Sequence, residues 1–125
     1  MLDEIIGEKM RTIKLSCAHA LFKFLIAQKT IIDGKKVPLF PGAFAIYGHG
    51  NVACLGQAME EFQSDLPGYR GHHEQSMALS GIGYTRAMRR KQIFIATSSS
   101  GPGAMNMVTA AGVASSNRLP ILLLP

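Results

Sequence analysis

The sequence predicts an α/β domain built on an open parallel sheet with helices on both faces. Three observations support this fold class. Short apolar runs with strand character alternate with longer segments whose apolar residues recur at helical spacing. The two best candidate strands each run into a glycine-rich turn, at residues 48–51 and 100–103. Finally, strands that alternate with helices form parallel sheets, because each helix returns the chain to the edge where the strand began.

The elements follow from local signals. The domain occupies residues 12–125, after a polar lead-in over 1–11, and Ser16 is a good N-cap for the first helix. The predicted elements are, in chain order, a helix to residue 28, a loop over 31–41 with a turn at Asp33 and Gly34, a strand over 42–47, a helix over 51–63, a short extended segment over 66–69, a helix over 74–89, a strand over 92–97, a helix over 103–115 and a strand over 121–124.

The last strand and the composition set limits on the class of protein. Four consecutive aliphatic residues are typical of a strand covered on both faces, so we expect the sequence to be a piece of a longer protein. Of the 125 residues, 47% are hydrophobic and 17% are charged, which favours a packed core over disorder. The basic residues behind the net charge of +5 are scattered, apart from a group at the helix end over 86–91 with no aromatics nearby, so we expect no nucleic-acid partner.

The apolar runs and the cysteines indicate the compartment. No apolar run is long enough to cross a bilayer, and we expect no membrane association. Cys17 and Cys54 both lie in predicted helices and suggest no disulfide framework. We therefore expect a cytoplasmic protein with reduced thiols.

Glu74 is the candidate carboxylate of a functional site. It lies where a short extended segment meets an apolar helix. The carboxyl ends of parallel strands share one edge of the sheet, so we expect Glu74 to lie near both glycine-rich turns. An acid in the first turn of a helix is also favoured by the helix dipole alone, and its position leaves that structural role open.

The two turns have functional and structural interpretations. Gly48, Gly50 and Asn51 fit the pattern G-x-G-x-x-A of dinucleotide sites, but no acid ends a second strand about 20 residues later, as such sites require. A turn whose backbone closely approaches a ligand is favoured over a purely structural tight turn. The segment Gly101-Pro102-Gly103 could bind a phosphate at a helix start or could be a plain helix entry.

The histidines do not predict a metal site. His49, His72 and His73 come from two loops, and no Cys-x-x-Cys or His-x-x-x-His spacing accompanies them. We expect no metal ligands within this chain.

Several segments together resemble a known family. The segments are Ile46 to Val52, His73-Glu74-Gln75, Thr97 to Ala111 and Asn117 to Pro125. In this order they resemble the pyrimidine-binding domain of thiamine-diphosphate enzymes over about residues 12–125. Within that superfamily, Gly48-His49-Gly50-Asn51 looks most like the ring-opening hydrolases of myo-inositol catabolism, which cleave a C–C bond in a cyclic 1,2-dione. Acetolactate synthases, which usually carry Pro-Gly-Gly there, are the alternative, and a non-catalytic nucleotide-binding module is another.

The resemblance implies specific roles. Glu74 matches the glutamate that hydrogen-bonds the cofactor's aminopyrimidine ring and activates the cofactor, and an apolar pocket should favour its protonated form. Residues 48–51, with Gly48, Gly50 and Asn51, would approach the cofactor, and His49 would contact a small-molecule substrate. Residues 101–104 would line the same cleft.

The resemblance also implies partners outside this chain. The family binds the diphosphate and Mg²⁺ with a separate domain of a partner subunit, through a Gly-Asp-Gly segment that this sequence lacks. We therefore expect at least a homodimer, with the cofactor between subunits.

Overall fold

A parallel sheet forms the centre of the computed structural model, which describes residues 12–46 and 48–125. The predicted lead-in over 1–11 and Tyr47 lie outside the described residues. The four strands are all parallel and lie in the order β4-β3-β5-β6. Their bounds are β3 Ala43–Ala45, β4 Gly68–Arg70, β5 Ile95–Thr97 and β6 Leu122–Leu124.

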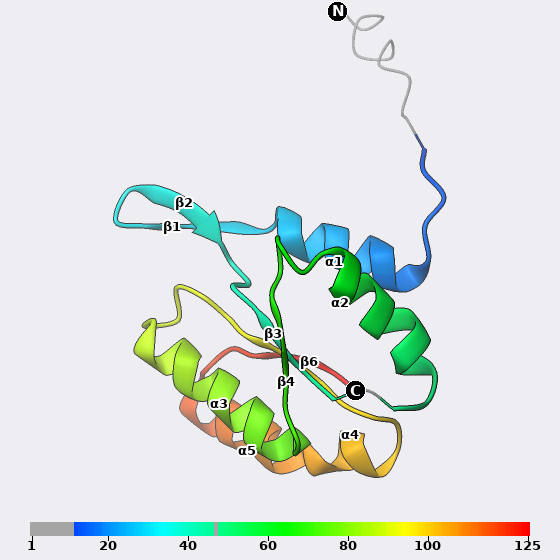
Figure 1. The fold of residues 1–125 in the computed structure, drawn as a ribbon. Helices are drawn as coiled ribbons and strands as arrows, with labels where there is room; N and C mark the ends of the chain where they lie inside the picture. Colours follow the sequence, from blue (N-terminus) through cyan, green and yellow to red (C-terminus); the bar gives the residue numbers. More distant parts are fainter. Residues whose placement is uncertain (1–11, 47) are drawn as a thin grey trace, which may run out of the picture.

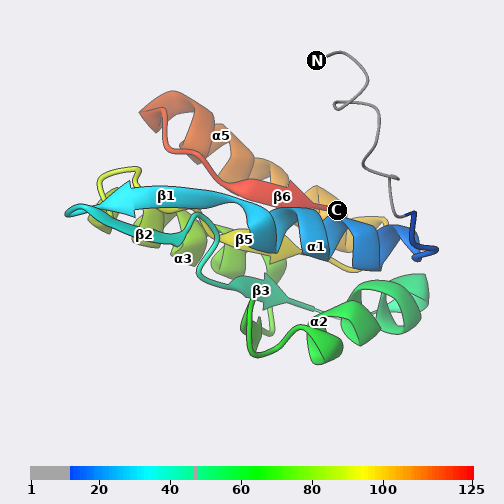
Figure 2. The ribbon, with the colours of Figure 1, turned by 90° about the horizontal axis from the view of Figure 1, so that it is seen from above.

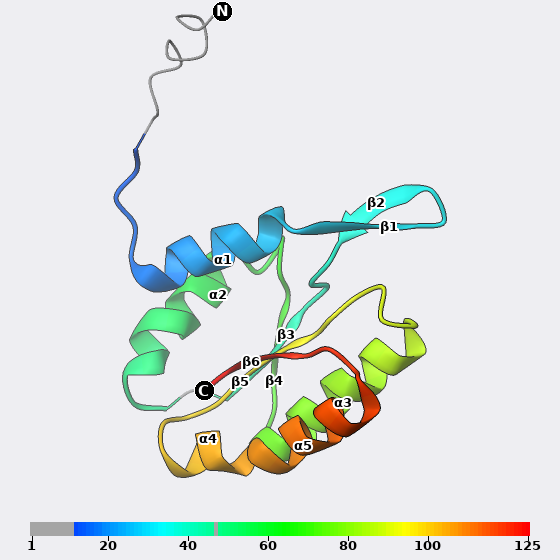
Figure 3. The same ribbon diagram turned by 180° about the vertical axis from the view of Figure 1, so that it is seen from behind.

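Helices cover both faces of this sheet (Figure 1). Helices α1 (Cys17–Ala27) and α2 (Gln57–Glu61) lie on one face. Helices α3 (Glu74–Ala87), α4 (Pro102–Asn106) and α5 (Val108–Asn117) lie on the other, where α3 and α5 run side by side (Figure 3). The predicted fold class is confirmed.

The first helix begins where its capping residue predicts. The Ser16 hydroxyl accepts a hydrogen bond from the backbone N–H of His19 at 3.3 Å, which satisfies one of the free donors of the first turn. The apolar stripe of α1 buries Ala18, Phe22 and Leu25 against the sheet and α2.

The predicted loop over residues 31–41 is wrong as far as residue 38, because residues 29–38 form an antiparallel hairpin. Strands β1 (Lys29–Ile32) and β2 (Lys35–Pro38) pair with each other and extend away from the main sheet (Figure 2). Only the predicted turn is correct: Asp33 has φ 50° and Gly34 has φ 76°. Two successive left-handed residues match the twist of a two-residue hairpin, for which Asp-Gly is a favoured sequence.

Two predicted helices are broken into shorter pieces. The segment over 51–63 consists of a 3₁₀ turn η1 (His49–Asn51), a π-helical segment η2 (Val52–Gly56) and then α2. The segment over 103–115 is divided into α4 and α5 at Met107, and it begins one residue early, at Pro102. The predicted strand over 92–97 is shortened to β5, and the Gln92 side chain instead donates to the carbonyl of Pro38 at 2.8 Å.

The contacts between sheet and helices are made largely by small side chains. Fully buried alanines occupy the strands and the helices that face them, namely Ala43, Ala45, Ala58, Ala78, Ala96 and Ala110. Gly81 of α3 is packed so closely that an added Cβ would lie 3.0 Å from Ile121 Cδ1. The helices therefore lie close to the sheet, and this close packing fixes where the loops at the sheet edge begin.

Candidate active site

The strand order creates a crevice at one edge of the sheet. From β3 the chain passes through α2 on one face, whereas from the adjacent β5 it passes through α4 and α5 on the opposite face. The loops after β3 and β5 therefore diverge, and ligands of open α/β sheets bind at such a switch point. The loop after β4, which leads to α3, lies at the same edge because β4 is parallel to β3.

Specific contacts join the loops that follow β3 and β5. The Asn51 side chain donates a hydrogen bond from Nδ2 to the carbonyl of Ser98 at 3.1 Å. A Cβ on Gly48 would lie 2.9 Å from Ser99 Cβ, so only glycine allows the two loops to approach this closely. Gly48 itself is extended, with φ −158°. Any residue can adopt an extended backbone, so glycine is required at this position because it has no side chain.

Glu74 lies at the start of α3 and is only 8% exposed. Its two carboxylate oxygens have different partners. The Ser99 hydroxyl donates to Oε1 at 3.4 Å, and Nδ2 of Asn106 donates to Oε2 at 3.2 Å. Gly103 packs directly on this pair, because a Cβ there would lie 2.5 Å from both Glu74 Oε1 and Ser99 Oγ.

The pKa of the Glu74 carboxyl is held below its ordinary value of 4.5. The hydrogen bond from its own backbone N–H is the largest cause, and it outweighs burial, which acts in the opposite direction. The bonds from Asn106 and Ser99 lower the pKa further. The expected apolar pocket that favours the protonated form is therefore wrong for this chain. The apolar side chains of α3 face the core, while the carboxyl faces the polar loops.

The structure brings some of the predicted site residues together. Gly103 touches Glu74, and Pro102 begins α4 directly after Gly101, which adopts φ 60°. His49 is exposed with φ 52°, and no hydrogen bond joins it to Glu74 among the described residues. Gly50 is also exposed, and an added Cβ there would meet nothing within 4 Å.

Three residues that contact the site were not predicted: Ser99, Asn106 and His73. The His73 side chain caps α3, with Nδ1 accepting from the backbone N–H of Ser76 at 3.3 Å. Its other ring nitrogen, Nε2, lies 3.1 Å from Asn106 Nδ2. The spacing of Gly103 and Asn106, one helical turn apart in α4, was the available signal, since it places both on one helix face.

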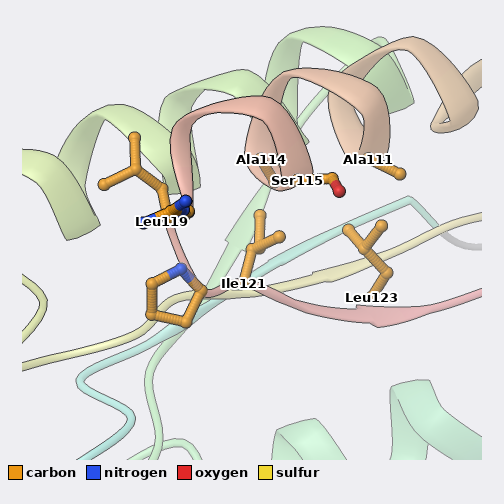
Figure 4. A pocket seen from close by; sticks show the side chains of 8 residues that line it. Ala111, Ala114, Ser115, Leu119, Ile121 and Leu123 are labelled. Atoms are coloured by element: carbon orange, nitrogen blue, oxygen red, sulfur yellow. The ribbon is translucent and has the colours of Figure 1, made fainter.

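One hollow opens at this edge of the sheet, and a more apolar one lies away from it. A hollow of about 210 Å³, lined by Ile46, Arg70, Gly71 and His72, opens at the ends of β3 and β4. A more apolar hollow of about 460 Å³ lies between α5 and β6, and Ala111, Ala114, Ile121 and Leu123 face it (Figure 4). No residue of the three loops around Glu74 lines the second hollow. It is therefore separate from the candidate site.

Two features are absent from the part of the chain that the structure describes. No group of three or more His, Cys, Asp or Glu side chains there is arranged to hold a metal ion. No helix in the same part of the chain has the length and apolar character needed to cross a membrane.

Comparison with known proteins shows the family of this domain. Residues 42–125, which include all four strands and all three loops of the site, match the model of the thiamine pyrophosphate enzyme family for its N-terminal TPP-binding domain. The chain belongs to the thiamine pyrophosphate enzyme family. The resemblance seen in the sequence is confirmed, and the crevice with Glu74 lies in that family's TPP-binding domain.

Three relatives of this chain carry the same name. The chain is 52% identical over 116 residues to the 3D-(3,5/4)-trihydroxycyclohexane-1,2-dione hydrolase of Clostridium tetani. It is also 52% identical to the hydrolase of that name from Geobacillus thermodenitrificans, and 47% identical to that from Bacillus thuringiensis. Each match covers 93% of this chain and 18% of the relative. The chain thus spans less than a fifth of the length of these relatives.

Proposed function

We propose that the full-length protein is a thiamine-diphosphate-dependent hydrolase that cleaves a C–C bond in a cyclic polyhydroxy 1,2-dione. In this proposal, the chain supplies the carboxylate that activates the cofactor. The observation that carries the proposal is the position of Glu74, buried at the switch point of a sheet that belongs to this family. The name of two relatives that are 52% identical to the chain supports the substrate class.

The residues of the crevice fit an aminopyrimidine ring. A carboxylate held by Ser99 and Asn106 is a fixed partner for a ring nitrogen. Gly48 and Gly103 allow their loops to pack directly on Ser99 and on the Glu74 carboxyl, which holds these groups in place beside the crevice. The hydroxyl of Ser98 is fully buried and has no hydrogen-bond partner among the described residues, which leaves a polar group free for a ligand.

The residues would act as follows. Glu74 would hydrogen-bond the aminopyrimidine nitrogen and hold or release a proton at its Oε atoms. The backbone of Gly48, Gly50 and Asn51 on one side, and of residues 101–103 on the other, would flank the ring. His49 would contact substrate from η1, where its side chain is exposed. When bound, thiamine diphosphate supplies an electron sink for the carbanion that C–C cleavage leaves behind.

The rest of the site is proposed to lie outside this chain. Binding a diphosphate with Mg²⁺ needs oxygen ligands, and the described residues around Glu74 include no second carboxylate. We therefore place the Mg²⁺ ligands in a further domain, with the cofactor bound between two subunits of at least a homodimer. Cys17 and Cys54 are both free and exposed, which supports a reducing, cytoplasmic location.

Glu74→Gln in the full-length protein tests this proposal. The variant keeps the size and much of the hydrogen bonding of the side chain but cannot transfer a proton. We expect a native circular dichroism spectrum and a turnover of the cyclic dione that is lower by about 10²–10⁴-fold at saturating cofactor. Glu60→Gln, on the exposed side of α2, is the matched control and should leave turnover unchanged.

Two outcomes would contradict the proposal. Near-normal turnover of the Glu74→Gln variant would remove the assigned role of the carboxylate. The second outcome comes from titrating the full-length protein with thiamine diphosphate and with NAD. An enzyme of this family should bind thiamine diphosphate, so binding of NAD alone would indicate a nucleotide-binding module instead.

A further inference from the structure

The small hollow at the ends of β3 and β4 lies beside the crevice. Its volume is about 210 Å³, and its lining consists of four residues, Ile46, Arg70, Gly71 and His72. The pairing of the two strands continues up to this hollow, because the backbone N–H of Gly71 donates to the carbonyl of Ala45 at 3.0 Å. The hollow therefore lies at the carboxyl edge of the sheet, where Glu74 begins α3 two residues after His72.

The packing of Gly71 determines where its two neighbours point. A Cβ on Gly71 would overlap the Met77 side chain, so this side of the extended segment lies against α3. Successive side chains of an extended segment point to opposite faces. Arg70 and His72, which precede and follow Gly71, therefore point away from α3, and both line the hollow.

The charged groups at this edge are mostly basic. The described residues of the three loops carry one guanidinium, on Arg70, and three imidazoles, on His49, His72 and His73. The acid closest to them in the chain is Glu74, at the start of α3. Among the described residues, no hydrogen bond or ion pair joins Arg70 or His72 to an acidic side chain. The guanidinium is thus available to an anion that enters the hollow.

The proposed reaction produces such an anion. Hydrolysis of a C–C bond beside a carbonyl adds the hydroxyl of water to the carbonyl carbon and the hydrogen to the other carbon. In a cyclic 1,2-dione the ring opens and the carbonyl becomes a carboxylic acid, which loses its proton near neutral pH. A neutral substrate therefore gives an anionic product. The new carboxylate forms at an edge that already holds the carboxylate of Glu74, and like charges repel.

We propose that Arg70 and His72 form a subsite that binds the carboxylate of the ring-opened product. The inference rests on the proposed function, since C–C hydrolysis is the step that forms this carboxylate. Arg70 supplies a permanent charge and paired N–H donors that match the two oxygens of a carboxylate, and His72 supplies one further N–H. The subsite offsets the repulsion from Glu74. Because the dione is neutral, the charge of Arg70 favours the product over the substrate.

Product inhibition of the full-length protein tests this subsite. Arg70→Gln removes charged hydrogen bonds, so the inhibition constant of the product should rise about 10-fold, while the KM of the neutral dione should stay within about twofold. Arg70→Lys keeps the charge without the planar fork and should retain part of the affinity. His72→Ala removes a single donor and should raise the constant about 3-fold. Arg86→Gln, an exposed position in the last turn of α3, is the matched control and should change neither constant.

Calorimetry on the full-length protein makes the test independent of turnover. The probe is D-glucuronate, a polyhydroxy aldehyde acid, and D-glucose is the neutral comparison because it carries a hydroxymethyl group in place of the carboxylate. The parent should bind D-glucuronate about 10-fold more tightly than D-glucose, and Arg70→Gln should lose this preference. Arg86→Gln should keep it.

Several results would overturn the subsite. Equal affinity of the parent for the two sugars would remove the carboxylate preference. A KM for the dione that rises as much as the inhibition constant in Arg70→Gln would show that Arg70 does not distinguish product from substrate. Loss of thiamine-diphosphate affinity in that variant would assign Arg70 to the diphosphate, and loss of the oligomer would assign it to a subunit contact. A protein that prefers D-glucuronate but does not cleave the dione would instead reject the proposed function.

Discussion

Gly103→Ala should disable the site through a single added methyl group. The new Cβ would lie 2.5 Å from both Glu74 Oε1 and Ser99 Oγ, and ordinary contacts begin at 3.4 Å. The carboxylate must therefore move by close to 1 Å. Its bonds to Ser99 and Asn106 are already 3.4 and 3.2 Å long, so a displacement of this size breaks at least one of them.

The expected effect on activity is much larger than the effect on stability. A misplacement of about 1 Å at a reacting group costs about 10²-fold in rate. Overpacking costs about 1–3 kcal/mol, but alanine is favoured over glycine in a helix by about 1 kcal/mol, so we expect a net loss of about 0–2 kcal/mol. Gly112→Ala in α5 is the matched control, because an added Cβ there meets nothing within 4 Å.

The assay compares turnover, thiamine-diphosphate affinity and thermal midpoint for both variants of the full-length protein. Gly112→Ala should retain activity and become slightly more stable. Gly103→Ala should keep its fold and lose about 10²-fold in turnover. If Gly103→Ala turns over within twofold of the parent, the close packing of α4 on Glu74 does not determine the geometry of the site.

Three further predictions follow from individual residues. Thr85→Val should raise the free energy of unfolding by about 1 kcal/mol, because the Thr85 hydroxyl is fully buried and has no partner among the described residues. The thermal midpoint should then rise, and a lower midpoint would contradict this. The folded-state pKa of Glu74 lies below 4.5, so ionised Glu74 stabilises the fold above that pH. The difference in thermal midpoint between the parent and Glu74→Gln should therefore vanish as the pH falls through the lowered pKa. A difference that persists in acid would exclude this linkage. His49→Asn, which tolerates the positive φ, should weaken substrate turnover about 10-fold or more without changing thiamine-diphosphate affinity in calorimetry; the reverse pattern would place His49 at the cofactor.

Much of the fold could be predicted because the signals are local and mutually consistent. Ser16 at the start of α1, and alternating strands and helices afterwards, require little knowledge of tertiary structure. The hairpin could not be predicted from apolar alternation, because β1 and β2 carry lysines and bury little against the core. There the Asp33–Gly34 turn was the better guide.

The site was predictable in position but not in its contacts. The edge that holds Glu74 follows from parallel topology alone. Ser99 lies in the loop after β5, and Asn106 shares a helix face with Gly103, but the sequence does not show that either one contacts Glu74, because contacts between separate elements are not visible in it. The direction of the Glu74 pKa was wrong for the same reason, since the apolar stripe of α3 describes the helix and not the surroundings of its first side chain.

The alanines between the sheet and its helices have a consequence for how this domain can diverge. Such a side chain offers almost nothing to remove, and neighbours at van der Waals distance leave little room to add a methyl group. Core sequences usually diverge through compensating pairs of large-to-small and small-to-large substitutions. Such pairs are largely excluded for the alanines between the sheet and its helices. Sequence change should accumulate in the hairpin and on the outer helix faces, while the spacing beneath the crevice stays fixed. New specificities in descendants would then have to arise from loop residues such as His49 rather than from repacking of the scaffold.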